Sequence, residues 1–130
     1  MKKTGLLGLI LAAAIGAGCY IDVDHVSDPR GAFEAAKAEI RKIDARGRAH
    51  ELHVLAYDPD DHELVRVSLP MWLCRKISDE NDWDIDDNDY GEAGRKASRH
   101  IRQVDFRRAR PGLVVEVDED DGEKVLVWLR

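Results

Sequence analysis

Residues 51–69 read ELHVLAYDPDDHELVRVSL, and the fold follows from this stretch. Apolar side chains alternate with polar ones before and after an acidic, proline-containing segment, 58–62, which has the composition of a tight turn. Residues 113–129 repeat the pattern around Asp121-Gly122, a strong hairpin signal. The sequence therefore predicts two antiparallel hairpins, each with one apolar face.

A helical stripe precedes each hairpin. The first contains Phe33, Ala36, Ile40 and Ile43, and the second contains Ala93, Ala97, Ile101 and Val104. Both sets recur at the spacing of one helix face. Pro70 predicts the start of a third, short helix between the hairpins. We expect an α+β fold: a two-layer sandwich in which an antiparallel four-stranded sheet, built from two α-β-β units, carries its helices on one face.

The two units are related by an internal similarity. Residues 40–57 align with 101–118 at an offset of 61, and residues 60–69 align with 120–129 at an offset of 60. Identical residues fall on inward-facing and turn positions, which favours a duplication over two unrelated hairpins. A single domain over 29–130 is therefore predicted, with units 29–78 and 90–130 and an exposed acidic loop over 78–89.

The first 18 residues have the pattern of an export signal. Lys2 and Lys3 precede an uncharged, apolar run over 5–17, which is too short to span a membrane comfortably. The run ends in Ala17-Gly18-Cys19, which resembles the end of a bacterial lipoprotein signal, although Gly16 stands where such signals have an aliphatic residue. The resemblance implies cleavage after residue 18 and acylation (palmitate-type chains) of Cys19. An ordinary secretory signal and an uncleaved anchor are the alternatives.

The lipoprotein resemblance also implies a place in the cell. Tyr20, not Asp, follows Cys19, which favours the outer membrane facing the periplasm; a secreted or periplasmic protein is the alternative. Residues 19–28 are expected to be a tether after the lipidated cysteine. Removal of Lys2 and Lys3 changes the net charge from −6 to −8, so membrane attachment is expected from the lipid and not from charge.

Two further motifs resemble small uncharacterised modules of bacterial envelope proteins. The first runs from Val65 to Pro70, with valines at alternate positions before a short helix. The second is the closing hairpin, 115–127, with its acidic-Gly turn. The resemblance implies association with the envelope and no established catalytic role.

Catalytic and metal-binding patterns are weak. Weak metal candidates are Asp82, Asp84, Asp86 and Asp89. Every EF-hand register through this loop lacks the required Gly or the final Glu. His50 and His53 are three apart at the start of a strand, which directs them to opposite faces. Cys74 lies in an apolar stretch and is expected to be a small buried residue, with an intermolecular disulfide as the alternative. We predict no catalytic site, no metal site and no cofactor.

The remaining surface features concern partners. Apolar side chains are expected on the second face of the sheet, where either the middle helix covers them or a partner binds them. The candidate partner-binding set on this face or beside it is Tyr57, Trp72, Leu126 and Trp128. The pI of about 5.3 argues against a nucleic-acid partner. A basic stretch over 95–110 is expected to be a solvated helix face, with an anionic glycan or lipid headgroup as the sharper alternative.

These observations predict a non-catalytic lipoprotein of the cell envelope that acts as a structural or protein-binding module. It would be held at the membrane by its lipid and could have an envelope protein as its partner. A secreted inhibitor or peptide-binding module is the alternative. A metal-binding or hydrolytic envelope protein that uses the acidic loop is a weaker one.

Overall fold

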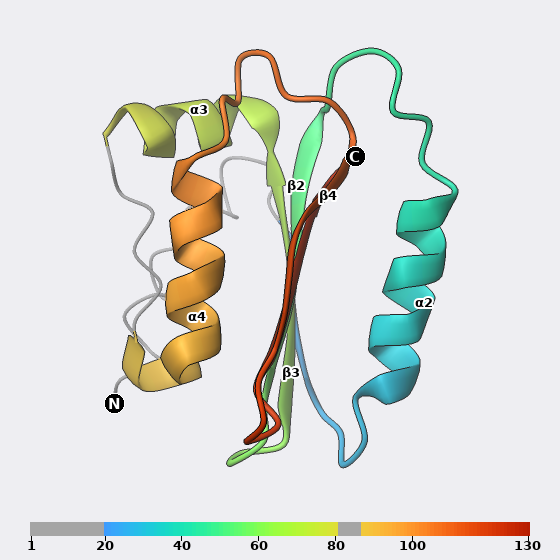
Figure 1. Ribbon diagram of the computed structural model, residues 1–130, viewed down its shortest axis with the longest axis vertical. Helices are drawn as coiled ribbons and strands as arrows, with labels where there is room; N and C mark the ends of the chain where they lie inside the picture. Colours follow the sequence, from blue (N-terminus) through green and yellow to red (C-terminus); the bar gives the residue numbers. More distant parts are fainter. Residues whose placement is uncertain (1–19, 81–86) are drawn as a thin grey trace.

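One antiparallel sheet with helices on both faces makes up the described part of the protein (Figure 1). This computed structural model describes residues 20–80 and 87–130, with the backbone alone for 87–90. Its elements are β1 (Tyr20–His25), α2 (Arg30–Arg41), β2 (Glu51–Asp58), β3 (Glu63–Pro70), α3 (Met71–Asp79), α4 (Asp87–Arg102), β4 (Gly112–Asp118) and β5 (Lys124–Leu129). The α+β class and the antiparallel sheet agree with the prediction.

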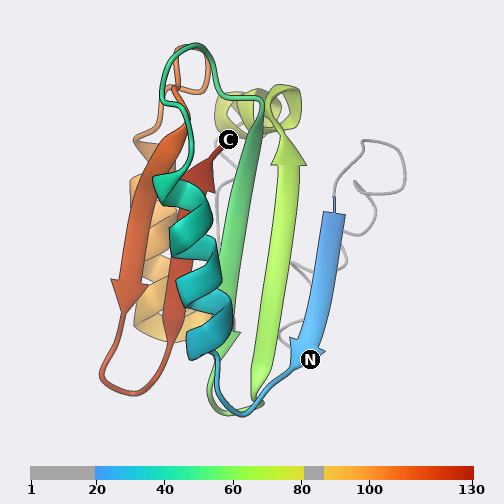
Figure 2. The same ribbon diagram turned by 90° about the vertical axis from the view of Figure 1, so that its right-hand side faces the viewer.

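The sheet has five strands in the order β1-β3-β2-β5-β4, so the predicted four strands were one too few (Figure 2). The additional strand is β1, which covers residues that we expected to be part of a tether. It pairs with β3 from Tyr20 opposite Ser68 to His25 opposite Glu63. Ile21 and Val23 alternate with acidic residues in this segment, which is the period of a strand.

The predicted two-layer arrangement is also wrong, because the helices occupy both faces. In Figure 1 the sheet is seen nearly edge-on, with α2 on one side and α3 and α4 on the other. The physical reason lies in the central strands, β2 and β5, which are apolar on both faces. Leu55 and Leu126 are opposite one another on the α2 side, whereas Leu52 and Leu129 are opposite one another on the other side. Two apolar faces need two covering layers.

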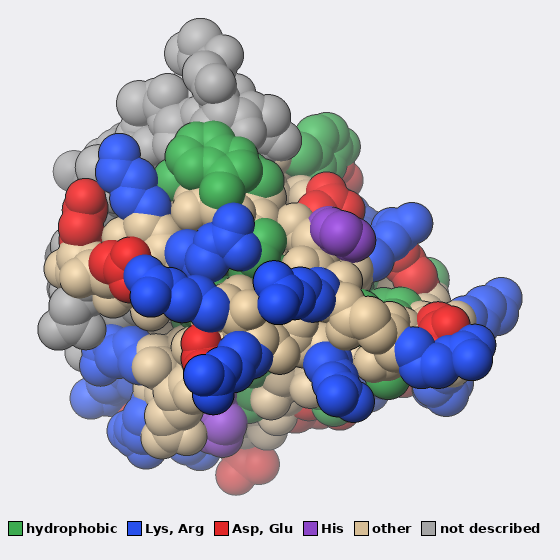
Figure 3. Space-filling model, turned by 90° about the horizontal axis from the view of Figure 1, so that it is seen from above, with side chains coloured by type: hydrophobic (Ala, Val, Ile, Leu, Met, Phe, Trp, Pro, Cys, Tyr) green, Lys and Arg blue, Asp and Glu red, His purple; other side chains and the backbone are tan. Residues whose placement is uncertain are grey.

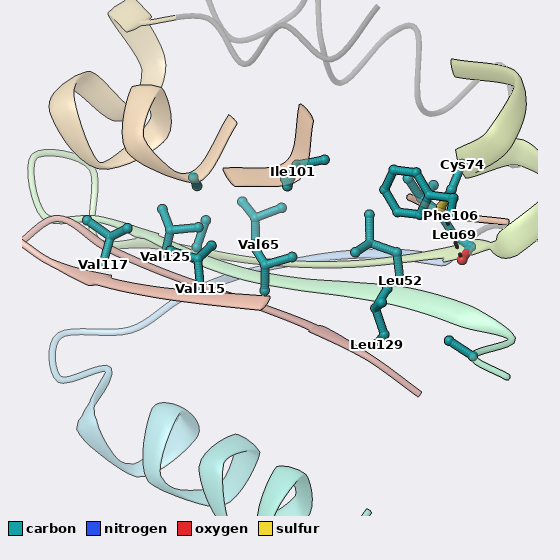
Figure 4. Close-up of a cluster of buried hydrophobic side chains, with 14 of the residues drawn as sticks. Leu52, Val65, Leu69, Cys74, Ile101, Phe106, Val115, Val117, Val125 and Leu129 are labelled. Atoms are coloured by element: carbon teal, nitrogen blue, oxygen red, sulfur yellow. Dashed lines mark hydrogen bonds between the residues drawn. The ribbon is translucent and has the colours of Figure 1, made fainter. Parts of the chain in front are cut away.

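The larger core lies between the sheet and helices α3 and α4 (Figure 4). The predicted helical stripe is confirmed there, since Ala93, Ala97 and Ile101 are all buried. Cys74 of α3 is fully buried, as expected for a small core residue. The small alanines let α4 approach the strands closely, and the valines of β4 and β5 fill the space below them.

The smaller core lies beneath α2. Directly before this helix, the side chain of Asp28 accepts a hydrogen bond from the backbone N–H of Arg30 at 3.0 Å. Phe33 and Ala36 are buried against the sheet, and Ile40 and Ile43 pack at the edge of the same cluster. The predicted stripe of the first helix is therefore confirmed, although it covers the opposite face from α4.

The predicted acidic loop, 78–89, is shorter than expected. Helix α3 continues to Asp79, and helix α4 begins at Asp87, while residues 81–86 lie outside the described part of the chain. Gly91 interrupts α4 with φ 55° and ψ −135°, a conformation that glycine adopts without steric cost.

The two halves share local geometry. Arg46 and Arg107 each donate a backbone hydrogen bond to the aspartate two residues earlier, Asp44 or Asp105. The aligned apolar residues of β3 and β5 face the same core. Helices α2 and α4, however, lie on opposite faces of the sheet. The duplication stays a prediction.

Candidate functional site: a basic end of the sheet

Two loops at one end of the sheet are strongly basic. Loop 42–50 leads into β2 and loop 103–111 leads into β4, and both lie at the end where α3 sits (Figure 1). With the helix residues that precede them, segments 41–50 and 102–111 contain eight Lys or Arg residues and two Asp. The eight cations are all exposed: Arg41, Lys42, Arg46, Arg48, Arg102, Arg107, Arg108 and Arg110. We call this surface the basic end, and Figure 3 shows it from above.

The backbone of the basic end is held by hydrogen bonds and packing. The N–H of Ala49 donates to the carbonyl of Ala109 at 3.0 Å, which joins the two loops directly. The carbonyl of His50 accepts from the N–H of Met71, which ties the first loop to the start of α3. Phe106 is buried in the larger core beneath the second loop. The cations therefore project from a fixed scaffold.

Most of these cations are not neutralised by a neighbour. Arg46 pairs with Asp44 at 3.0 Å, and Arg107 pairs with Asp79 at 3.2 Å. Within residues 20–80 and 87–130, no ion pair is recorded for the following cations: Arg41, Lys42, Arg48, Arg108 and Arg110. The pKa of Asp44 lies below its usual value because the Arg46 side chain and backbone N–H both donate hydrogen bonds to it. The basic end therefore keeps a net positive charge at neutral pH.

Two exposed aromatic residues flank this surface. Trp72 lies in the first turn of α3 and is 49% exposed, and Tyr20 begins β1 and is 57% exposed. Tyr20 is opposite Ser68, two residues before the end of β3 at Pro70. Both aromatics therefore lie at the end of the sheet that carries the basic loops.

The opposite end of the sheet is acidic. The turns between β2 and β3 (58–63) and between β4 and β5 (118–123) contain nine Asp or Glu residues and no Lys or Arg. Lys96 pairs with Glu119 at 2.7 Å, and Lys124 pairs with Asp118 at 2.8 Å. The pKa of Glu123 is raised by burial and by the neighbouring charge of Asp121. We call this surface the acidic end.

A shallow hollow opens beside the basic end, where the last turn of α2 meets the second loop. It is lined by Glu39, Lys42, Ile43, Asp44, Pro111 and Arg130. Its two carboxylates are both paired, Glu39 with Arg130 at 2.7 Å and Asp44 with Arg46. The hollow therefore offers no concentration of one charge that would select a ligand.

Three of the four residues predicted to bind a partner are buried. Tyr57, Leu126 and Trp128 are each less than 6% exposed and lie in the smaller core under α2. Coverage of this face was one of the two expected alternatives, but the first helix covers it and not the middle one. Trp72 is the member of the set that reaches the surface.

The remaining candidates fall into two groups. Cys19, Asp82, Asp84 and Asp86 lie outside the described residues, as does the side chain of Asp89. His50 is exposed in its loop, while His53 stacks on Trp128 with ring centroids 5.2 Å apart. In residues 20–80 and 87–130, no group of three or more His, Cys, Asp or Glu residues could hold a metal ion.

Sequence reasoning recognised the cations of 95–110 but missed those of 41–48. The missing signal was the strand order: β2 and β4 both run antiparallel to β5, so they run in the same direction and the loops before them meet at one end. A prediction of hairpins alone does not fix that arrangement.

Comparison of the chain with known protein families, characterised proteins and solved structures found no match. No helix in the described part of the chain combines the length and apolar character needed to cross a membrane.

Proposed function

We propose that the protein is a non-catalytic lipoprotein of the cell envelope, anchored by a lipid on Cys19 and acting as a structural or protein-binding module. The observation that carries the proposal is the N-terminal sequence: two lysines, an uncharged apolar run over 5–17 and Ala17-Gly18-Cys19. The run has the length of a signal-peptide core and is short for a transmembrane helix.

Cys74 and Tyr57, whose side chains carry a thiol and a hydroxyl, both take part in the packing of the fold. The buried thiol of Cys74 is surrounded by apolar side chains, where a thiol is inert. The buried polar side chains of the sheet serve its own packing: Tyr57 donates a hydrogen bond to the carbonyl of Val26 at 3.1 Å. We propose the outer membrane, facing the periplasm, as its location, because Tyr20 follows Cys19.

Intact-mass analysis of the protein from a bacterial membrane fraction tests the proposal. We expect a species that begins at Cys19 and carries the added mass of a diacylglyceryl group and an amide-linked acyl chain. The variant Cys19→Ser should lose that mass and remain unprocessed. A mature wild-type protein without lipid, recovered from the soluble periplasmic fraction, would show instead that residues 1–18 are an ordinary secretory signal.

A further inference from the structure

We propose that the basic end docks on an anionic phospholipid surface, with its arginines and lysines contacting lipid phosphates and Trp72 and Tyr20 at the headgroup level. The proposal rests on the proposed membrane anchorage and adds an orientation and a lipid chemistry to it. The acidic end would then point away from the membrane.

Strand β1 starts at the basic end of the sheet, directly after Cys19. Tyr20 pairs with Ser68 near the end of β3, so β1 starts at the basic end and runs away from it. Cys19 directly precedes Tyr20. One residue spans at most about 3.6 Å, so a lipid on Cys19 brings this end of the sheet to the membrane. Because Tyr20–His25 form strand β1 and not a flexible tether, the lipid determines which end of the sheet faces the membrane.

Positive and negative charges are separated at the two ends of the sheet. The whole chain has a net charge of −6 and residues 19–130 have −8, and either value alone predicts repulsion from anionic lipids. Its strands are six to eight residues long, which places the two ends about 20–25 Å apart. This distance exceeds the Debye length of about 8 Å at physiological ionic strength by more than a factor of two. The acidic end is therefore screened from a surface that the basic end contacts.

The exposed residues at the basic end are of types that contact phospholipid headgroups. Arginine forms bidentate hydrogen bonds with phosphate oxygens, and five of the eight cations carry no recorded ion pair in the described residues. Tryptophan and tyrosine gather at the boundary between headgroups and acyl chains, where one part of the ring is apolar and the other is wet. Trp72 and Tyr20 lie at the same end of the sheet as the arginines.

A nucleic acid would meet the same cations, since it is also a polyphosphate. The position of Tyr20 favours the membrane, because the beginning of the described chain and the cations lie at one end. The experiment therefore also compares binding to duplex DNA with binding to anionic vesicles.

The test is sedimentation of the full chain, as the non-acylated variant Cys19→Ser, with phosphatidylcholine vesicles that contain either no phosphatidylglycerol or about one third of it. The apolar run over 5–17 contributes equally to both vesicle types, so the difference between them reports the headgroup charge. We expect at least a tenfold preference for the anionic vesicles at low salt, and its loss at high salt. Because the variant carries no lipid, this result is independent of the acylation test above.

Charge variants locate the contact. Arg108→Gln with Arg110→Gln should reduce binding to anionic vesicles by about tenfold or more, since each basic residue near such a surface contributes about fivefold. The matched control is Arg30→Gln with Lys124→Gln, which changes the net charge equally outside the basic end and should reduce binding less than twofold. Trp72→Ala should weaken binding to both vesicle types. Circular dichroism checks that each variant is folded.

Three results would overturn the proposal. The first is equal binding to neutral and anionic vesicles at low salt. The second is an equal loss of binding in the two double variants, which would mean that net charge and not the basic end is responsible. The third is tighter binding to duplex DNA than to anionic vesicles at physiological salt.

Discussion

Leu126 and Leu113 are leucines on neighbouring strands with opposite environments. Leu126 of β5 is fully buried in the smaller core, whereas Leu113 of β4 is 54% exposed. Leu126→Ala should lower the free energy of unfolding by about 2–5 kcal/mol, because it leaves a cavity under α2. Leu113→Ala should change it by about 0.5 kcal/mol or less. Urea denaturation measures both, and equal effects would contradict a second face covered by α2.

Glu123 gives the protein a pH dependence of defined sign. Its carboxylate accepts a hydrogen bond from the backbone N–H of Ala93, and it lies so close to Gly91 that a Cβ there would be 2.6 Å from one carboxylate oxygen. Burial, followed by the charge of Asp121, raises the pKa of Glu123 above its ordinary value of 4.5. The folded state therefore holds this proton more tightly than the unfolded state does.

A raised carboxyl pKa means that the contribution of Glu123 to stability falls as pH rises from about its unfolded pKa through its folded pKa. In Glu123→Gln this titration is absent. We expect the stability of the wild type, relative to the variant, to decrease from pH 4 toward neutrality. Thermal unfolding at a series of pH values measures the difference, and a difference that is constant with pH would contradict the assigned cause.

At the scale of elements, α2 is joined to the edge of the sheet by an ion pair. Lys37 of α2 lies 2.5 Å from Glu116 of β4 and also contacts Glu34 of its own helix. The pKa of Lys37 is raised chiefly by its hydrogen bond with Glu116. A double-mutant cycle of Lys37→Ala and Glu116→Ala should give a coupling energy of about 0.2–1 kcal/mol that decreases with salt. No coupling at low salt would show that α2 is held by its apolar face alone.

The elements also show what the sequence could predict. The strands of the two hairpins and the stripes of α2 and α4 were predictable because alternation and helical spacing are local signals. The face of the sheet that each helix covers is not a local property of the sequence. Leu55 and Leu126 form a second apolar face, and only the three-dimensional packing shows that Phe33 of α2 covers them. Strand β1 was missed because its alternation lies directly after a signal-like segment.

For the candidate site, prediction and structure diverge for a related reason. Trp72 lies at the surface, whereas Trp128 and Tyr57, the candidates on the second face of the sheet, are covered by α2. The basic end brings together residues about sixty positions apart in sequence, such as Arg48 and Arg110, and the sheet order alone does so. Net charge, which averages over the chain, conceals such a surface.

At the scale of the whole molecule, the loops at one end of the sheet are basic and the turns at the other end are acidic. A lipid on Cys19 would be joined to β1 without a flexible linker. The orientation of the domain relative to the membrane should therefore be fixed. In the proposed orientation, the loops that contain Arg48 and Arg108 lie near the membrane, and the turn that contains Asp60 lies far from it. This orientation can be tested independently of how tightly the protein binds.

Site-specific fluorescence quenching tests this claim most directly. An environment-sensitive label would be placed on Arg108→Cys or on Asp60→Cys of the acylated protein in vesicles that contain headgroup-labelled quencher lipids. Cys74 is fully buried, so it should not compete for the label in the folded protein. The account predicts strong quenching at position 108 and weak quenching at position 60. Equal quenching at the two positions, or stronger quenching at position 60, would contradict it.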